Sequence, residues 1–418
     1  MRILWLKTEL LHPVDKGGKI RTYNMLKEMK REHHITYLTL DDGSASSDAR
    51  ERADEYCHEL VCIPHRLREK FSIGFYVELL LNLTSSLPYA IKKYESAAMR
   101  REIASRQDSN SFDVLVCDFL APAPNVPLTS HIPTILFQHN VEAMIWKRHY
   151  ETQTRAIQKL YLHGQWRKMQ KFEREMCRRF DTVIAVSAED RDQIRAEYGA
   201  QSVFDVPTGV DTDFFRPGGT ESPVPNSLVF TGSMDWLPNQ DAILYFAGEI
   251  MPLIKQRIAD VTLTIVGRNP SASLLECAKY DPSLIITGRV DDVRPYIERS
   301  AAYIVPLRIG GGTRLKIFEA LAMEKPVIST SVGAEGLPIS NGVDLLLADE
   351  PVQFADAVTR VLTNTAIAAD LGRSGSRTVR QNHGWRQVAE RFLSICTNMR
   401  PATEPATAGR LTSPTTVL

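Results

Sequence analysis

The stretch IVPLRIGGGTRLKIFEALAMEKPVISTSVGAEGL, residues 304–337, contains the pattern on which the fold assignment depends. A short apolar run ends at Leu307, and three glycines follow at residues 310–312. A helical pattern then begins near Thr313, and a second apolar run covers residues 327–329. A strand, a glycine-rich loop, a helix and a strand in this order form an α/β unit.

Similar units recur along the chain. The apolar runs are short and rich in Val, Ile and Leu with little alternation, which is typical of parallel strands buried on both faces. The sequence predicts strands at residues 3–6, 35–40, 114–117, 134–137, 182–186, 228–231, 261–266, 284–287, 302–305 and 327–329, and helices at 241–254, 315–323, 354–362 and 385–396. This alternation predicts an α/β protein with doubly wound parallel sheets.

A dense run of Pro and Gly at residues 205–225 predicts a linker between two domains. We expect one Rossmann-like domain at 1–207 and a second at 208–384. We further expect a helix at 385–399 that packs back on the first domain, and a disordered tail at 400–418. Ligands of such sheets bind at the carboxyl ends of the strands, so a cleft between the domains is expected.

Composition excludes some classes of function. The 418 residues contain 50 basic and 50 acidic side chains, and this balance argues against a dedicated nucleic-acid binder. The six cysteines form no Cys-x-x-Cys pair, which favours reduced thiols in a cytoplasmic protein without a zinc site. The first apolar run is too short for a signal peptide, and no segment is apolar enough to predict a transmembrane helix.

The glycine triplet points to an anion site. Glycines let the backbone approach a ligand, and a helix N-terminus offers free N–H groups, which together suit a diphosphate. Arg314 and Lys316 lie in the first helical turn, where the helix dipole disfavours cations unless they meet phosphate oxygens. Glu319 could accept two hydrogen bonds from a ribose diol. The alternative is a flexible loop with a solvated basic face and a surface glutamate.

With four further blocks, this stretch resembles the signature of the retaining GT-B glycosyltransferases of glycosyltransferase family 4. The blocks are VSAEDRDQIRAEYG (186–199), VPTGVDTDFFRP (206–217), FTGSMDWLPNQDAILYF (230–246) and TGRVDDVRPYI (287–297). The chain is most similar to the branch that builds bacterial exopolysaccharides and includes sugar transferases of PEP-CTERM sorting loci. The resemblance implies the GT-B fold, a nucleotide-sugar donor and no essential metal or other cofactor.

The resemblance also implies roles for residues of the second half. Glu319 matches the second of two family glutamates and would bind the donor ribose. The first of these falls at Gly311, so backbone amides of Gly311, Gly312 and Thr313 would serve the sugar and phosphate instead.

The diphosphate clamp also departs from the family pattern. Many members have an arginine where Ser233 follows Gly232, and a lysine near Asn239, so the clamp is expected on Arg314 and Lys316. The backbone of Arg289 and Val290 matches the nucleobase loop.

In the first half, Gly17 and Gly18 follow the first strand and lead into a helix. By resemblance they line the cleft near the acceptor and the donor phosphate, although a simple capping turn is the alternative. His139 lies just past the strand at 134–137 and by resemblance contacts the transferred sugar, although a structural histidine is the alternative. Retaining members are expected to use a front-side displacement, in which the leaving diphosphate helps to take the acceptor proton.

Two acidic pairs are interpreted structurally. Asp211 and Asp213 match an Asp-x-Asp motif that binds metal in another glycosyltransferase fold, but here they lie in the linker block. Asp291 and Asp292 are interpreted as helix capping. No metal site is predicted.

Two segments suggest a membrane surface. Residues 147–179 contain ten Lys or Arg against three Glu, with aromatic residues between them, and residues 65–83 are basic first and then strongly apolar. Such segments suit the anionic inner leaflet of a membrane. The alternative is a solvated helix face together with a core helix.

The sequence therefore predicts a retaining hexosyltransferase that uses a UDP- or GDP-sugar and a glycolipid or polysaccharide acceptor in cell-surface glycan synthesis. Its expected location is cytoplasmic, with peripheral attachment to the cytoplasmic face of the membrane. The alternatives are a GT-B epimerase or phosphorylase, and a non-catalytic membrane-peripheral assembly subunit, which the glycine at position 311 favours.

Overall fold

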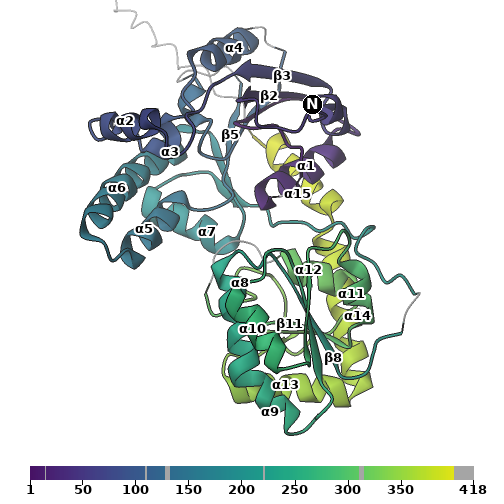
Figure 1. The fold of residues 1–418 in the computed structure, drawn as a ribbon. Helices are drawn as coiled ribbons and strands as arrows, with labels where there is room; N and C mark the ends of the chain where they lie inside the picture. Colours follow the sequence, from purple (N-terminus) through teal and green to yellow (C-terminus); the bar gives the residue numbers. More distant parts are fainter. Residues whose placement is uncertain (15, 109–110, 128–131, 220–221, 310–314, 400–418) are drawn as a thin grey trace, which may run out of the picture.

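The chain forms two α/β domains, shown in Figure 1 as an upper domain in purple to teal and a lower domain in green to yellow. The computed structural model describes residues 1–14, 16–108, 111–127, 132–219, 222–309 and 315–399. Within these residues each domain has one parallel sheet covered by helices on both faces. This is the doubly wound α/β class that the alternating pattern predicted.

The first sheet has the strand order β3-β2-β1-β4-β5-β6-β7, and all its pairings are parallel. Its strands are β1 (Arg2–Lys7), β2 (His34–Asp41), β3 (Glu59–Pro64), β4 (Val114–Asp118), β5 (Thr134–Phe137), β6 (Thr182–Ala185) and β7 (Val203–Asp205). Successive residues of β1 enter two different cores, because Leu4 and Leu6 pack on one face while Ile3 and Trp5 pack on the other. Burial on both faces explains why this strand reads as a continuous apolar run.

The connections of the first domain carry its helices. They are α1 (Gly17–Met29), η1 (Glu51–Glu55), α2 (Ile73–Asn82), α3 (Tyr89–Lys92), α4 (Ala97–Asp108), η2 (Ala123–Asn125), α5 (Glu142–Thr152), α6 (Ala156–Arg179), α7 (Ala188–Gln193) and η3 (Ile194–Tyr198). Helix α1 begins directly at Gly17 and Gly18, as the sequence predicted. Helices α2, α3, α5 and α6 gather on one side of this domain (Figure 1).

The second sheet repeats the arrangement with the order β10-β9-β8-β11-β12-β13. Its strands are β8 (Ser227–Thr231), β9 (Thr262–Val266), β10 (Leu284–Gly288), β11 (Ala302–Val305), β12 (Val327–Ser329) and β13 (Leu346–Leu347). Its helices are α8 (Leu237–Tyr245), η4 (Phe246–Ile250), α9 (Met251–Lys255), α10 (Ala272–Tyr280), α11 (Arg294–Arg299), α12 (Leu315–Ala322), α13 (Pro351–Thr363) and α14 (Thr365–Asn382).

The last helix, α15 (Trp385–Thr397), leaves the second domain and lies beside α1 of the first (Figure 1). Its buried residues Val388, Ala389 and Phe392 belong to the same apolar core as Trp5 and Leu26. The junction before it is tight, because a Cβ on Gly209 would lie 2.6 Å from the Trp385 ring.

Candidate active site

Each sheet has a topological switch point beside its first strand. The next two strands of the chain are added on one side of that strand, and the later strands are added on the other side. In the first domain this point lies between β1 and β4, and in the second between β8 and β11. Parallel α/β sheets bind ligands at the carboxyl ends of the strands next to such a point. In each domain, polar side chains meet at this place.

In the first domain the centre is Asp118, the fully buried last residue of β4. Its Oδ2 accepts hydrogen bonds from Lys7 Nζ at 2.8 Å, from Thr22 Oγ1 at 2.6 Å and from Trp5 Nε1 at 3.0 Å. Its Oδ1 lies 2.7 Å from Nε2 of His139. Burial alone raises the pKa of Asp118, but the Lys7 ammonium and His139 outweigh it and hold that pKa well below its usual range.

His139 is buried and precisely oriented from two sides. Its ring stacks on Phe119 with centroids 3.9 Å apart, while Asp118 holds its Nε2. Phe119 adopts a left-handed backbone conformation with φ of 72°, and a Cβ on Gly18 would lie 2.6 Å from the Phe119 ring. The sequence-predicted Gly18 and His139 are therefore brought together through a residue that the sequence did not indicate.

The environment also sets the protonation state of His139. Burial, opposed by the Asp118 carboxylate, lowers the pKa of His139 to about 4, so the ring is neutral at pH 7. A carboxylate can only accept, so the ring proton lies on Nε2 and the lone pair on Nδ1. His139 thus has the form of a hydrogen-bond acceptor.

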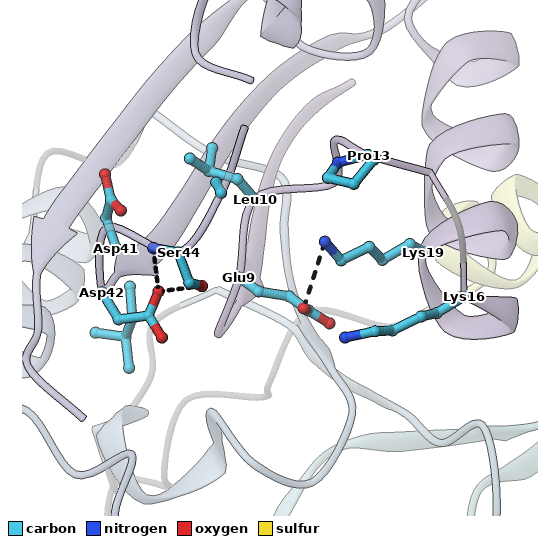
Figure 2. A pocket seen from close by; sticks show the side chains of 10 residues that line it. Glu9, Leu10, Pro13, Lys16, Lys19, Asp41, Asp42 and Ser44 are labelled. Carbon is cyan, nitrogen blue, oxygen red and sulfur yellow. Dashed lines mark hydrogen bonds and ion pairs between the residues drawn. The ribbon is translucent and has the colours of Figure 1, made fainter. Parts of the chain in front are cut away.

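A pocket of about 190 Å³ opens where β1 and β2 end and α1 begins (Figure 2). Figure 2 shows Lys16 and Lys19 on one side with the Glu9 carboxylate next to them, and Asp41 and Asp42 on the other side. The lining includes Glu9, Leu10, Pro13, Lys16, Lys19, Asp41, Asp42 and Ser44. Lys19 Nζ lies 3.5 Å from Glu9 Oε2, and the Ser44 hydroxyl donates to Asp42 at 2.5 Å. The wall of the pocket is rich in groups that can bind hydroxyls.

In the second domain, Lys316 of α12 reaches across to the loop after β8. Its Nζ lies 3.0 Å from Asn239 Oδ1 and 4.1 Å from the centroid of the Phe230 ring. A Cβ on Gly232 would come within 2.7 Å of both Lys316 Nζ and Asn239 Nδ2, so a side chain at this position would have to displace these two groups. The predicted residues Gly232 and Lys316 therefore meet, although they are far apart in the sequence.

The same loop receives a second cation. Arg268, just after β9, donates from Nε to the Ser233 hydroxyl at 2.8 Å and lies 3.5 Å from Asp235. Ser233 stands where the family pattern has an arginine, so Arg268 brings a guanidinium to that neighbourhood from the next strand. Sequence reasoning missed Arg268, because no local pattern links residue 268 to residue 233.

Glu319 follows Lys316 by three residues on α12 and is half-buried. Burial, partly offset by Lys316, raises its pKa to about 7. Burial is the main cause that raises the pKa of Tyr303, and the negative charge of Glu319 raises it further, so the two side chains are neighbours. The hydroxyl of Tyr303, the second residue of β11, lies 2.6 Å from Oγ1 of Thr231 at the end of β8.

The remaining predicted residues fall into two groups. Gly311, Gly312, Thr313 and Arg314 lie outside the described residues. Arg289 and Val290 lie just after β10, where Arg289 is exposed and Val290 packs on the core.

One member of each acidic pair has a structural partner. Asp211 Oδ1 accepts from the backbone N–H groups of Asp213 and Phe214, which closes a turn. Asp292 Oδ1 accepts from the backbone N–H of Arg294, the first residue of α11.

The buried network of the first domain was also missed from sequence. The available signal was a charged residue at the end of each of two apolar runs, Lys7 after RILWL and Asp118 after VLVC. In parallel sheets such positions lie at the ligand-binding edge.

Comparison with known proteins places both halves in glycosyltransferase families. A family model described as Glycosyltransferase Family 4 matches residues 16–214, and one described as Glycosyl transferases group 1 matches residues 225–364. A Klebsiella pneumoniae protein, "Uncharacterized 44.6 kDa protein in cps region", is 20% identical over 404 residues, which cover 94% of this chain and 98% of that protein.

Two characterised proteins are similar at lower coverage or identity. The phosphatidyl-myo-inositol mannosyltransferase of Mycobacterium tuberculosis is 27% identical over 224 residues, covering 51% of this chain and 58% of its own. HepE of Anabaena, solved in complex with UDP and glucose, has a TM-score of 0.62 at 10% identity and covers 95% of this chain and 100% of its own. From these matches and the two Rossmann-like domains, the chain is a glycosyltransferase of the family 4 type with the GT-B fold.

Proposed function

We propose that the protein is a retaining hexosyltransferase that moves a hexose from a UDP- or GDP-sugar to a glycolipid or polysaccharide acceptor in bacterial cell-surface glycan synthesis. The observation that carries this proposal is the pairing of Lys316 and Glu319 one turn apart on α12, beside the switch point of the second sheet. A cation and a carboxylate at this spacing suit the diphosphate and the ribose of one nucleotide.

The comparisons support the choice of substrates. HepE, which has a similar fold, was solved with UDP and glucose, and this favours a nucleotide-sugar donor here. The Klebsiella protein named for a cps region matches almost the whole chain, and this favours synthesis of a surface polysaccharide.

The chemistry rests on positioning and on stabilisation of the leaving group. Lys316 and Arg268, together with Arg314, which the sequence motif indicates, would neutralise the diphosphate as its bond to the sugar breaks. His139, neutral and held as an acceptor, would bind a hydroxyl of the transferred sugar. The acceptor oxygen then attacks from the face that the diphosphate leaves, and the diphosphate helps to take its proton. No metal or other cofactor has a part in this scheme.

The pocket between β1, β2 and α1 is the proposed place for the acceptor sugar. Carboxylates such as Asp42 and Glu9 accept hydrogen bonds from hydroxyls, and lysines such as Lys16 donate them. A purely apolar acceptor would make no use of these hydroxyl-binding groups.

Titration calorimetry with UDP and GDP tests the donor site directly. We expect one nucleotide to bind, and Lys316→Ala and Glu319→Ala to weaken it by about 1–3 kcal/mol each, because each removes a charged hydrogen-bond partner. Lys279→Ala and Glu276→Ala, at exposed positions on α10, are matched controls and should leave binding unchanged. If neither nucleotide binds, the enzymatic proposal is wrong and the non-catalytic subunit is favoured.

A donor screen with UDP-, GDP- and ADP-sugars and a membrane extract then tests the reaction. Transfer of the sugar to the extract with retained anomeric configuration is expected. A product that forms equally well without acceptor would indicate an epimerase, and a sugar phosphate released from polysaccharide by inorganic phosphate would indicate a phosphorylase.

A further inference from the structure

Helix α2 is amphipathic, but its apolar side faces outward. Five large apolar residues recur at the spacing i, i+3, i+4, i+7 and i+8, which is one face of a helix. Their exposed fractions are 85% for Ile73, 56% for Tyr76, 49% for Val77, 67% for Leu80 and 66% for Leu81. Phe71 and Leu83, which flank the helix, are exposed to 78% and 54%. We call these seven residues the α2 surface.

The opposite side of α2 is firmly held by the protein. Gln165 Nε2 donates to Asn82 Oδ1 at 2.9 Å, and Lys168 Nζ donates to the backbone carbonyl of Asn82 at 2.7 Å. Glu78 accepts from the Tyr89 hydroxyl at 2.9 Å. Asn82 is therefore buried against α6, while Glu78 binds Tyr89 and also pairs with the exposed Arg68 at 3.2 Å, so these contacts of α2 with the protein are made by its polar residues.

Helix α6 extends this surface. Ile157 and Leu160 are exposed to 87% and 75%, and by the helical period they share a face with Lys168, which holds α2. Figure 1 shows α2 and α6 on the same side of the first domain. The exposed apolar residues thus continue from one helix to the next.

Cations surround the apolar residues. Arg66, Arg68 and Lys70 are exposed in the segment that leads into α2, and Lys171 is exposed on the Ile157 face of α6. Residues 147–179 carry a net charge of seven positive, from ten basic and three acidic residues. An apolar strip bordered by cations is complementary to an anionic phospholipid surface, whose acyl chains take the apolar groups and whose headgroups take the charges.

The dimensions favour a helix that lies on a bilayer. Helix α2 has 10 residues and is about 15 Å long, half the thickness of a hydrocarbon core. Within the described part of the chain, no helix is both long and apolar enough to cross a membrane.

We propose that the α2 surface, together with the first turns of α6, docks on a membrane containing anionic phospholipids. The biological purpose rests on the proposed function, since docking would bring the acceptor pocket to a lipid-linked acceptor. The docking itself requires neither donor nor acceptor and can be measured without them.

Sedimentation of the full chain with vesicles tests the proposal. We expect binding to vesicles of phosphatidylglycerol and phosphatidylcholine, and much weaker binding to phosphatidylcholine alone. Leu80→Ser with Leu81→Ser should lower the vesicle affinity at least about tenfold, because two leucines no longer enter the acyl region. Val343→Ser with Val352→Ser, at positions of 55% and 57% exposure in the second domain, is the matched control and should bind as the unchanged chain does.

The contribution of charge has its own variant. Arg66→Gln with Lys70→Gln should weaken binding to the anionic vesicles about tenfold or more at low salt, because each cation near an anionic surface contributes about fivefold. This variant should bind phosphatidylcholine vesicles no differently from the unchanged chain.

Three results would overturn the proposal: no binding of the unchanged chain to anionic vesicles, leucine variants that bind undiminished, or equal loss in the control. Light scattering could instead show that the unchanged chain is a dimer and the leucine variant a monomer, with no vesicle binding by either. In that case the surface is a contact between copies of the chain. Calorimetry with UDP and GDP on the leucine variant separates the two proposals, since nucleotide affinity should be unchanged whether or not docking is lost.

Discussion

Asp118 illustrates how a single buried charge can organise a site. Four side chains bind its two oxygens, and one of them, Lys7, is itself almost fully buried. A buried ion pair of this kind contributes little net stability, but removal of one partner leaves an uncompensated charge in the interior. The pair therefore acts mainly through the groups that it holds in place, His139 among them.

The first prediction concerns the protonation of His139. Lys7 lowers the pKa of His139 through its positive charge, while Asp118 raises it. Burial is the main cause that lowers this pKa and Lys7 is a smaller one, so Lys7→Met should raise the pKa of His139 only modestly from about 4 and leave it below its ordinary value near 6.5. NMR titration of the His139 ring measures this shift.

Lys19→Met is the control for that titration. Lys19, on α1, is also a buried lysine, but it pairs with Glu9 and is not among the groups that shift the pKa of His139. An unchanged titration in Lys7→Met would show that the ion pair does not control the histidine.

The second prediction concerns Glu319 and pH. Burial raises its pKa to about 7, so the carboxylate that we propose binds the ribose forms only as the pH rises through 7. Nucleotide affinity should therefore increase with pH, by up to about tenfold between pH 6 and pH 8. Glu319→Gln removes the titrating group and should abolish this part of the dependence, which isolates it from ionisation of the diphosphate itself. A dependence of equal size in Glu319→Gln would exclude the ribose role.

Individual residues differed in how far the sequence could predict them. The sequence could indicate Lys316 and Glu319 as candidates because both belong to one continuous motif. Arg268 and Asp118 were not, since their partners are 35 and 111 residues away in the chain and meet them only across neighbouring strands. Contacts of this kind follow from the strand order, which no local pattern records.

At the scale of elements, buried strands were the most predictable feature. All ten predicted strands are present, and most of them, such as β4 and β5, are buried along their whole length, which produces an uninterrupted apolar run. The strands β3, β7 and β13 were missed. Each lies at the edge of its sheet, and β3 and β13 are only half-buried, so their sequences lack that run.

Helix α2 shows a different limit. Periodicity indicates an amphipathic helix but does not say which partner its apolar face has. The alternative interpretation, in which residues 65–83 include a core helix, is wrong, since most of the large apolar residues of α2 are exposed and Asn82 is buried. Only the contacts of α6 with Asn82 show which side of α2 faces the protein.

The third prediction belongs to the start of α1. Gly17 and Gly18 are adjacent and both helical, but a Cβ on Gly17 would meet nothing within 4 Å, whereas one on Gly18 would overlap the Phe119 ring. Gly18→Ala should therefore lower the free energy of unfolding by about 1–3 kcal/mol through overpacking. Gly17→Ala should be neutral or slightly stabilising, because alanine favours the helix. Urea unfolding of the two variants measures the difference, and equal stabilities would contradict the close packing of α1 on Phe119.

At the scale of the whole molecule, the chain crosses between its domains twice. The first crossing follows β7, where Arg21 of α1 donates to the carbonyl of Val206. The second leads into α15, and Arg380 donates to the Thr212 carbonyl beside it at 3.1 Å. The composition of residues 205–225 predicted the first crossing, and the last helical pattern predicted α15 as an element.

The last prediction follows from the second crossing. Phe392 of α15 is fully buried, and its ring lies 5.5 Å from Trp5 and 5.2 Å from Phe137, both on strands of the first sheet. Phe392→Ala should cost about 3–5 kcal/mol and loosen the first domain, although the residue follows the second in the sequence. Hydrogen exchange should accelerate in β1 and β5 and stay unchanged in β8 and β11.

Phe354→Ala is the reciprocal variant for this experiment. Phe354 is also fully buried, but it belongs to the core of the second domain, where its ring packs on Phe246. Exchange should then accelerate in β8 and β11 while β1 is protected as before. If Phe392→Ala instead loosened the second sheet, α15 would be energetically part of the domain that precedes it, and the first sheet would not depend on the end of the chain for its core.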